Sequence, residues 1–215
     1  MRRILLLMLM LLPMLGMRAQ ITHTDKGSVD ANAEKVLAKA QSKMNGCVSF
    51  TVTMTSRDSD KKESGRQTAQ VLFNGGKYRV TFGDQVMYCD GKNVWNWNKK
   101  AKEVVVDRMS DSDDDLMNPA KLLSSYKKNY KAKFIRKEQD GTSVVDLTPK
   151  SRKSYYRVRL LVAESGVLKS IEMNNYDSSS AEFKVSAFKS GVKSTEADFV
   201  FPAAANKDVE VIDMR

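Results

Sequence analysis

The stretch that decides the fold runs from residue 86 to residue 106 and reads Val-Met-Tyr-Cys-Asp-Gly-Lys-Asn-Val-Trp-Asn-Trp-Asn-Lys-Lys-Ala-Lys-Glu-Val-Val-Val. Asp90-Gly91 is a strong hairpin signal, because a tight turn needs positive φ angles that Asp and Gly adopt at little cost. A second, polar turn at residues 98–102 is followed by a β-branched run. The stretch therefore predicts three short strands joined by two turns.

Both tryptophans of the chain lie in the middle one of these three strands. Trp95 and Trp97 are two residues apart, so in a strand they point to the same face. Two large rings on one face need an apolar surface to lie against. The simpler interpretation is an ordinary β-sheet core, and the alternative is an apolar internal surface that holds a ligand.

Residues 1–19 have the pattern of a secretory signal peptide. Arg2-Arg3 precede an apolar run of about 12 residues, rich in Leu and Met, at positions 4–15, which is the length of a signal-peptide core and too short to span a bilayer as a helix. The small Ala19 favours cleavage near that residue, and a retained anchor is the alternative. We expect an exported, periplasmic product in which residues 20–215 form a single domain.

The charge of the chain indicates which surfaces it suits. The formal net charge of +10 falls to +7 when Arg2, Arg3 and Arg18 leave with the signal peptide. A basic exported protein suits anionic surfaces better than nucleic acid, and the chain contains neither an RNP-type aromatic motif nor a recognition-helix pattern. We therefore expect no nucleic-acid partner.

The first element after the signal peptide is predicted to be an amphipathic helix at residues 28–44. Its apolar residues recur at helical spacing, which is typical of a face that packs on a core. Asn45-Gly46 ends it, since Gly is the usual left-handed cap.

From Cys47 onward the period of the apolar residues changes to two. Phe50, Val52 and Met54 alternate with hydroxyl side chains, as in a strand with one buried face. Similar runs separated by short turns continue through residues 67–107 and 131–188, followed by short segments at 198–201 and 208–212. We count about eleven strands and expect an antiparallel meander.

A short helix interrupts this meander. Asn118-Pro119 is a helix-start signal, with Asn as N-cap and Pro in the first turn, and Leu116, Leu122 and Leu123 are among its apolar residues. A short helix between strands can pack over one face of the sheet, so this helix is a candidate lid.

The residues before this helix, at positions 110–115, read Ser-Asp-Ser-Asp-Asp-Asp and imitate the opening of a calcium loop. The match then fails. With Asp111 as the first position of a calcium loop, position six is Leu116 instead of Gly and position twelve is Leu122 instead of Glu. We interpret the segment as a solvated acidic loop and expect no metal site.

The sequence offers little catalytic chemistry. His23 is the only histidine, so a His-dependent hydrolase lacks a base and a zinc site lacks its commonest nitrogen ligand. No Gly-rich phosphate loop is present. Carboxylate-only catalysis stays open because Asp and Glu are plentiful, but nothing picks out a pair. We expect neither an enzyme nor a bound cofactor.

The two cysteines, Cys47 and Cys89, each lie in or beside a predicted strand. An oxidising compartment allows them to form a disulfide, and two buried free thiols are the alternative. The choice between them depends on the distance between the two cysteines in the folded protein, which the sequence does not give.

A set of short motifs recurs in a fixed order from residue 43 to residue 213. They are Phe50-Thr51, Phe73 with Gly76-Lys77-Tyr78-Arg79, Asp90-Gly91-Lys92-Asn93-Val94-Trp95, Asn118-Pro119 with Leu122-Leu123, Leu147-Thr148-Pro149-Lys150, Gly166-Val167-Leu168-Lys169-Ser170-Ile171, and Phe199-Val200-Phe201-Pro202 with Asp208-Val209. In these motifs and their order the chain resembles the LolA family, periplasmic carriers that shuttle lipoproteins from the inner to the outer membrane.

The resemblance implies a mainly β fold with helices: an incomplete, half-open antiparallel barrel with an N-terminal helix and a helical lid. Its apolar interior accepts the acyl chains of lipoproteins, with no covalent step. The partners implied are acylated lipoproteins, an inner-membrane ABC-type lipoprotein-releasing transporter and, where one exists, an outer-membrane acceptor. The carrier is expected to be a monomer. We expect the acyl cavity to be lined by Phe50, Val52, Met54, Leu72, Tyr78, Val80, Trp95 and Trp97, beneath a lid of Leu116, Leu122 and Leu123.

One position departs from the family pattern. Family members often have Arg-Pro where this chain has Asn74-Gly75, and that Arg ties the barrel to the lid. Asn can still donate a hydrogen bond to a lid carbonyl, but it brings no charge and less reach. Arg79 matches the family's second Arg, so Asn74 and Arg79 are the gating candidates.

Two other classes of function stay open on the sequence. One is an envelope sensor or regulatory domain that binds a lipid on the same half-barrel and reports through a partner. The other is a structural envelope protein with an ordinary closed core.

Overall fold

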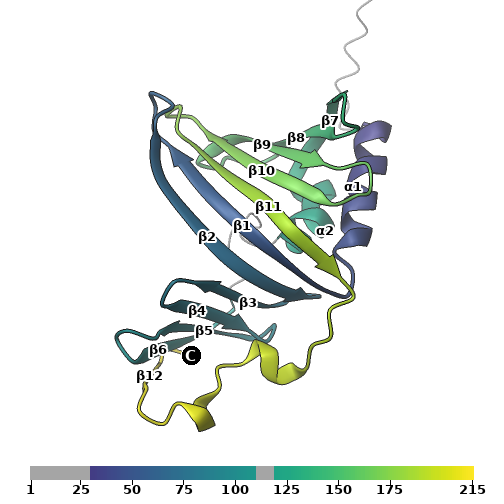
Figure 1. Ribbon diagram of the computed structural model, residues 1–215. Coiled ribbons are helices and arrows are strands. Elements are labelled where there is room, and N and C mark those ends of the chain that lie inside the picture. The colour runs from purple at the N-terminus through teal and green to yellow at the C-terminus, as the bar shows by residue number, and fades with distance from the viewer. Residues whose placement is uncertain (1–29, 110–118) are drawn as a thin grey trace, which may run out of the picture.

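A single sheet of twelve strands dominates the computed structural model, which describes residues 30–109 and 119–215 (Figure 1). The strands are β1 (Cys47–Arg57), β2 (Glu63–Asn74), β3 (Lys77–Phe82), β4 (Gln85–Cys89), β5 (Asn93–Asn98), β6 (Glu103–Arg108), β7 (Tyr130–Lys137), β8 (Ser143–Pro149), β9 (Tyr155–Val162), β10 (Leu168–Asn175), β11 (Ser180–Ser190) and β12 (Glu210–Asp213). The prediction of a mainly β fold is confirmed, with one strand more than the count of about eleven.

The sheet is open, not closed into a barrel. Its order is β12-β6-β5-β4-β3-β2-β1-β11-β10-β9-β8-β7, so β12 and β7 lie at its two edges. All neighbouring pairs are antiparallel except β12, which runs parallel to β6. The sheet curves around its inner face, here defined as the face that carries Phe50 and Val52 (Figure 1). The predicted half-open antiparallel barrel is therefore confirmed.

The N-terminal helix α1 (Ala31–Lys43) begins directly after its N-cap residue, Asp30. The carboxylate of Asp30 accepts hydrogen bonds from the backbone N–H groups of Asn32, at 2.8 Å, and Ala33, at 3.4 Å. These bonds satisfy amides that have no partner inside the helix. The predicted helix spanned residues 28–44, of which the first two lie outside the described residues.

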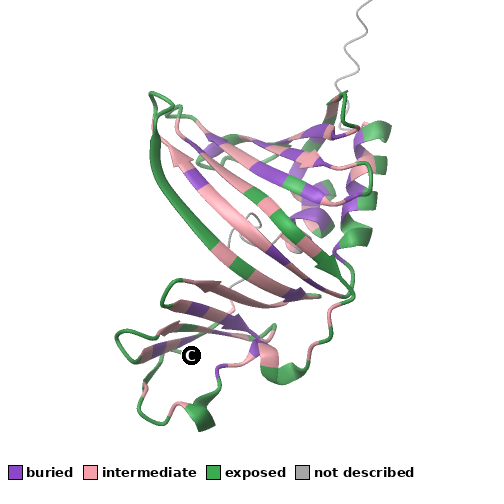
Figure 2. Ribbon diagram, viewed as in Figure 1, coloured by how far each residue is buried: buried purple, intermediate pink, exposed green. Residues whose placement is uncertain are grey.

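The second helix, α2 (Pro119–Asn129), begins at the proline predicted to open it. Leu122, Leu123 and Tyr126 are almost fully buried and belong to one core cluster with residues of α1 and of strands β7–β10. Both helices therefore cover the inner face on the β7–β10 side of the sheet. Buried residues, in purple, are frequent on these strands and on the facing sides of the helices (Figure 2). Phe50 on β1 and Phe73 on β2 also belong to this cluster, whereas most other inner-face residues of β1–β4 are only half-buried.

The segment after β11 differs from the prediction. Residues 198–201 were expected to form a strand, but Glu196–Phe199 is a short 3-10 helix, η2. The Asp198 carboxylate accepts hydrogen bonds from the Thr195 backbone N–H, at 2.8 Å, and hydroxyl, at 3.1 Å, which closes a turn in place of a strand. A second 3-10 turn, η3 (Ala203–Ala205), precedes β12, the short strand predicted at 208–212.

Both cysteines are free thiols. Cys89 is fully buried, with its sulfur 3.9 Å from the Gly76 carbonyl oxygen and 3.8 Å from the Met109 sulfur. Of the two alternatives left open by the sequence, the structure has two free thiols and no disulfide. Cys89 is buried as that alternative expected, and Cys47 is half-buried.

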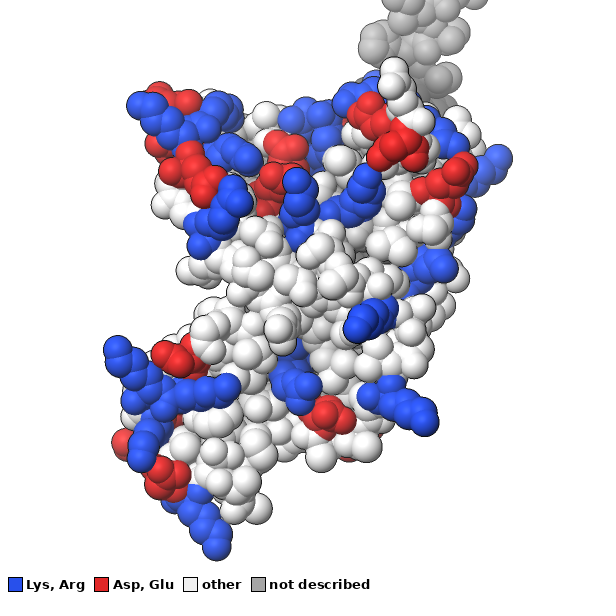
Figure 3. Space-filling view, viewed as in Figure 1, with Lys and Arg blue, Asp and Glu red and all other residues white. Residues whose placement is uncertain are grey.

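Three sequence features lie outside the described residues: the predicted signal peptide, His23, and the acidic segment with Leu116. Among residues 30–109 and 119–215, no helix has the length and apolar character needed to cross a membrane. The view in Figure 1 looks onto the outer face of β1, β2 and β11, with α2 behind them. On this side the charged side chains gather toward the two ends, and the band between them carries few (Figure 3).

A candidate apolar ligand cavity

The register of the central strands aligns apolar side chains from one strand to the next. Phe50 on β1 lies opposite Val71 on β2, and Val71 lies opposite Val80 on β3. On the other side of β1, Val52 lies opposite Val185 on β11. Because opposed residues of an antiparallel pair project from the same face, these side chains form a continuous apolar stripe across the inner face.

This stripe borders a cavity of about 300 Å³. Its lining comes from β1, β2, β3, β4, β10, β11 and the first residue of α2: Phe50, Val52, Met54, Gln67, Ala69, Val71, Phe73, Tyr78, Val80, Phe82, Met87, Pro119, Ile171, Phe183 and Val185. No carboxylate, ammonium or guanidinium group is among them.

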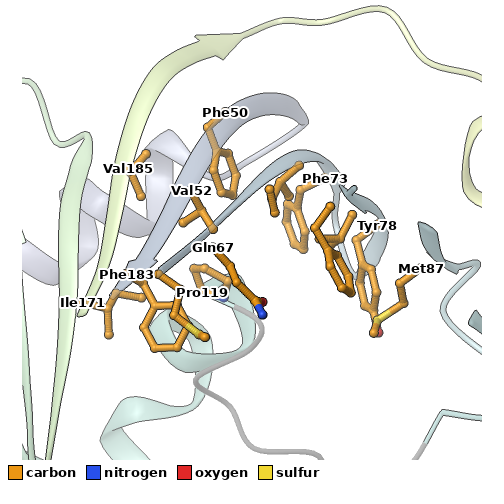
Figure 4. Close-up of a pocket in the computed structure, with 15 residues that line it drawn as sticks. Phe50, Val52, Gln67, Phe73, Tyr78, Met87, Pro119, Ile171, Phe183 and Val185 are labelled. Atoms are coloured by element: carbon orange, nitrogen blue, oxygen red, sulfur yellow. The ribbon is translucent and has the colours of Figure 1, made fainter. Parts of the chain in front are cut away.

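The cavity has two apolar walls (Figure 4). Phe73, Tyr78 and Met87 stand side by side along one wall, and Ile171, Phe183 and Pro119 gather at the other. The Gln67 side chain extends toward the space between them (Figure 4). Apart from this amide and the Tyr78 hydroxyl, the side chains offer only apolar surface, including the flexible thioether of methionine, which adapts to irregular apolar shapes.

Most of the lining side chains are only half-buried, in contrast to the core beneath the helices. Val52, Val71, Val80 and Phe183 are all of this intermediate class, whereas Leu122 in the helical core has no exposed surface. Leaving apolar area in contact with water costs about 25 cal/mol per Å². Gathered exposed apolar side chains on one concave surface are therefore typical of a site that a ligand or partner covers.

Five of the eight residues predicted to line an acyl cavity do line this one: Phe50, Val52, Met54, Tyr78 and Val80. The prediction missed the lining residues on β11, Phe183 and Val185, and those on β2, which include Phe73. Inward and outward side chains alternate along β2 as they do along β1. This alternation, with the correct register between β1 and β2, would have predicted the β2 lining residues.

Leu72 is placed differently from the prediction. It lies opposite Ser49 on β1 and Arg79 on β3, and it borders a separate polar hollow on the outer face with Thr51 and Thr81. The reason is the register: Phe73 and Val71, its two neighbours, point inward, so Leu72 must point outward.

Trp95 and Trp97 also point away from the cavity. They lie opposite Tyr88 and Val86 on β4, whereas Met87, between those two, lines the cavity. The tryptophans share one face, as predicted, but it is the outer face, where both pack into a second apolar cluster.

The C-terminal segment supplies the apolar surface that the tryptophans need. The ring centroids of Trp97 and Phe201 lie 5.3 Å apart at an angle of 68°, an edge-to-face contact. The indole N–H of Trp97 is buried and has no hydrogen-bond partner among the described residues. The interpretation of the tryptophans as ordinary core residues is therefore the correct one of the two.

The predicted lid residues belong to the core of the molecule. Leu122 and Leu123 are buried in the cluster that contains Leu37 of α1, and Pro119, which was not predicted, is the α2 residue that reaches the cavity. Leu116 lies outside the described residues. The α2 leucines hold this helix against the sheet and α1, and they do not line the cavity.

The two gating candidates lie away from the cavity lining. Asn74 ends β2 opposite Cys47 and Lys77. The Arg79 side chain is on the outer face, where its guanidinium pairs with the Asp198 carboxylate at 3.4 Å. Because α2 packs on the inner face, Arg79 lies on the opposite side of the sheet from this helix, and among the described residues no bond joins Arg79 to the lid.

Arg79 instead helps to hold the C-terminal segment against β3. Beside its pair with Asp198, Lys77 pairs with Glu196 at 2.5 Å. Backbone and hydroxyl hydrogen bonds from Thr195, with the nearby charge of Arg79, hold the pKa of Asp198 below its usual range, against a smaller opposing effect of burial. These exposed pairs are expected to contribute little each.

Fold and cavity together define the class of this protein: a half-open β-barrel with an apolar cavity on its concave inner face. The family model described as "Outer membrane lipoprotein carrier protein LolA" matches residues 48–202. The chain belongs to the LolA family.

A solved structure supports the fold. An uncharacterized conserved protein from Thermus thermophilus superposes with a TM-score of 0.56 at 16% identity, covering 85% of this chain and 99% of that one. A LolA superfamily protein from Nitrosomonas europaea gives 0.46 at 17% identity, with 79% and 97% covered. The MucA/MucB complex of Pseudomonas aeruginosa gives 0.41 at 16%, with 80% and 62% covered. No curated protein matches the chain.

Proposed function

We propose that this protein is a periplasmic carrier that holds the acyl chains of lipoproteins in the cavity between β1–β4 and β11. The observation that carries the proposal is the apolar cavity of about 300 Å³ in a member of the LolA family. Residues 1–19 are the signal peptide in this proposal, and residues 20–215 form the single carrier domain.

The physical chemistry of the cargo fits the cavity. An acyl chain leaving a membrane exposes apolar area worth about 0.8 kcal/mol for each methylene. The half-buried lining side chains offer that area an apolar surface without any charge to desolvate. Binding of this kind needs no covalent step, and in this proposal the protein acts as a carrier and not as an enzyme.

Release must be as easy as binding in a carrier. The cavity walls include flexible Met54 and Met87 and the first residue of α2, while the rest of the α2 core stays closed. Cargo can therefore enter or leave by displacing few contacts. In this proposal an inner-membrane ABC-type transporter supplies the lipoprotein, and the protein delivers it to the outer membrane.

A competition experiment tests the binding step. An apolar fluorescent dye is bound to the purified protein and titrated with a lipopeptide, and the same peptide without its acyl chains is the matched control. We expect the acylated peptide to displace the dye and the control peptide to leave it bound. Equal effects of the two peptides would exclude the cavity as an acyl site.

A second experiment separates a carrier from a lipid-binding sensor, the other function with the same cavity. Depleting the protein from cells and fractionating the envelope should leave lipoproteins in the inner membrane if the protein transports them. An unchanged lipoprotein distribution, together with acyl binding in vitro, would favour the sensor. A protein with an ordinary closed core is already disfavoured by the cavity.

A further inference from the structure

A basic segment at one end of the sheet has no role in the cavity. Residues 150–157 read Lys-Ser-Arg-Lys-Ser-Tyr-Tyr-Arg, with four cations and no carboxylate. They connect β8 to β9, and residues 150–154 are all exposed. A cluster of this density is typical of a site for a polyanion or an anionic lipid surface.

Two exposed tyrosines form a pair here, one within this segment and one in a neighbouring turn. Tyr156 is 40% exposed and Tyr176, in the β10–β11 turn, is 72% exposed. Their ring centroids are 5.6 Å apart, and the guanidinium of Arg157 lies 5.7 Å from the Tyr156 ring. Paired rings held in water beside cations have the amphipathic character of the aromatic residues that lie at the surface of bilayers.

The neighbouring loops meet at the same end of the sheet. The Lys61 ammonium in the β1–β2 turn donates to the Ser178 carbonyl in the β10–β11 turn, and Asn175 pairs with Tyr155 at the start of β9. The tips of these turns are exposed (Figure 2). We call Lys150, Arg152, Lys153, Tyr156, Arg157 and Tyr176 together the basic rim.

The end of α2 adds to the positive charge of the rim. The Lys150 ammonium donates to the Lys127 carbonyl at 2.5 Å, which brings the β8–β9 turn against the last turn of the helix. Lys128 is exposed beside it, while Lys127 pairs with Glu34. The β1–β2 turn has both signs of charge over residues 58–62, and the β10–β11 turn carries Asp177 beside Tyr176. Arg157 pairs with Asp146 at 3.9 Å. The cationic excess of the rim therefore comes from Lys150, Arg152 and Lys153 in the β8–β9 turn.

The turns beside the rim lie near one end of the cavity. Met54 and Phe183, which line the cavity, are opposed across β1 and β11, and three residues further on Arg57 and Ser180 are opposed where the two strands meet their turns. Three residues of strand correspond to about 10 Å. A flat surface that contacts the rim and these turns would therefore face the Met54 end of the cavity.

We propose that the basic rim docks the protein on the surface of an anionic lipid bilayer. Lys and Arg side chains near such a surface each strengthen binding about fivefold, and the effect is screened within a Debye length. The tyrosine rings lie at the headgroup level in this arrangement. Docking is reversible, because no long apolar segment enters the bilayer, and it brings the Met54 end of the cavity toward the lipids.

Vesicle flotation tests the proposal. The purified protein is mixed with vesicles of phosphatidylcholine alone or of equal parts phosphatidylcholine and phosphatidylglycerol. We expect binding to the anionic vesicles only, falling as salt rises. Arg152→Glu, which removes a cation and adds an anion, should weaken binding about 25-fold. The matched control is Lys100→Glu in the β5–β6 turn, an exposed site with the same change of charge, and it should bind as the parent does.

Two results would overturn the proposal. Equal weakening by Arg152→Glu and Lys100→Glu would mean that net charge, and not the rim, determines binding. The second result concerns heparin, a soluble polyanion. If the protein binds heparin with the same affinity as the anionic vesicles, and Tyr176→Ser does not change that affinity, the rim is a site for an acidic macromolecule. Dye binding in the cavity is measured on each variant and should not change, so failure of the rim and failure of the carrier proposal are distinguishable.

Discussion

The cavity assignment makes a quantitative prediction for a single charge placed on its wall. Val52 is half-buried at the centre of the lining, opposite Ala69 on β2 and Val185 on β11. In Val52→Asp the carboxylate contacts water as long as the cavity is empty, so the sheet should fold. Once an acyl chain fills the cavity, the carboxylate must lose its water or take up a proton.

Protonation sets the size of the expected loss. Neutralising a carboxyl group with the ordinary Asp pKa of about 3.9 at pH 7 costs about 4 kcal/mol, which is a loss of about a thousandfold in affinity. Direct burial of the charge would cost no less, since a buried unpaired ion is penalised by several kcal/mol. Because the protonated form is the one that binds, the penalty should shrink about tenfold for each pH unit as the pH falls toward 4.

The control is the next residue on the same strand. Thr53 points to the outer face, where its hydroxyl lies 3.3 Å from that of Thr68, so Thr53→Asp makes the same change of charge outside the cavity. Lipopeptide affinity is measured by dye displacement at pH 7 and pH 5, with circular dichroism to confirm folding. Equal affinities of the two folded variants, or a loss in Val52→Asp that does not shrink at pH 5, would refute the reasoning.

Three other side chains test the rest of the structure. Leu122→Ala should lower the free energy of unfolding by about 2–5 kcal/mol in urea titrations, because the side chain is fully buried. A negligible change would contradict the packing of α2. Phe201→Ala should expose Trp97 and shift its fluorescence to longer wavelength without altering dye affinity, because the two rings lie on the outer face; reduced dye affinity would place them in the cavity. Asp198 has a lowered pKa in the folded protein, so its contribution to stability is complete above the ordinary pKa of about 3.9 and is lost as the pH falls through the lower folded value. Asp198→Asn should flatten the acid limb of stability, and an acid limb identical to the parent's would show that this carboxylate does not contribute.

The class of fold could be predicted from the sequence because each strand repeats its own pattern. The alternation at Phe50, Val52 and Met54, and the turn at Asp90-Gly91, depend on local geometry alone. The same holds for the start of α2 at Pro119, whose fixed φ suits the first turn of a helix. These local signals are confirmed by the structure.

The C-terminal segment shows where local signals were insufficient. A strand was predicted at residues 198–201 from its apolar, β-branched character, and Phe199 and Phe201 are indeed buried. The hydrogen bonds from Thr195 to Asp198 close a 3-10 turn instead. Side-chain to backbone bonds of this kind compete with strand formation, and a pattern of apolar residues does not register them.

Which residues of one strand share a face can be read from the sequence, since that follows from a period of two within a continuous backbone. Which of the two faces becomes the cavity wall depends on how the strands pair in the folded molecule. Trp95 and Trp97 share a face as expected, yet that face lies against Phe201, while Val71 and Phe73 occupy the inner positions expected for Leu72. The physical reason is register: shifting a strand by one residue exchanges its two faces, and the pairing that fixes it is made between strands.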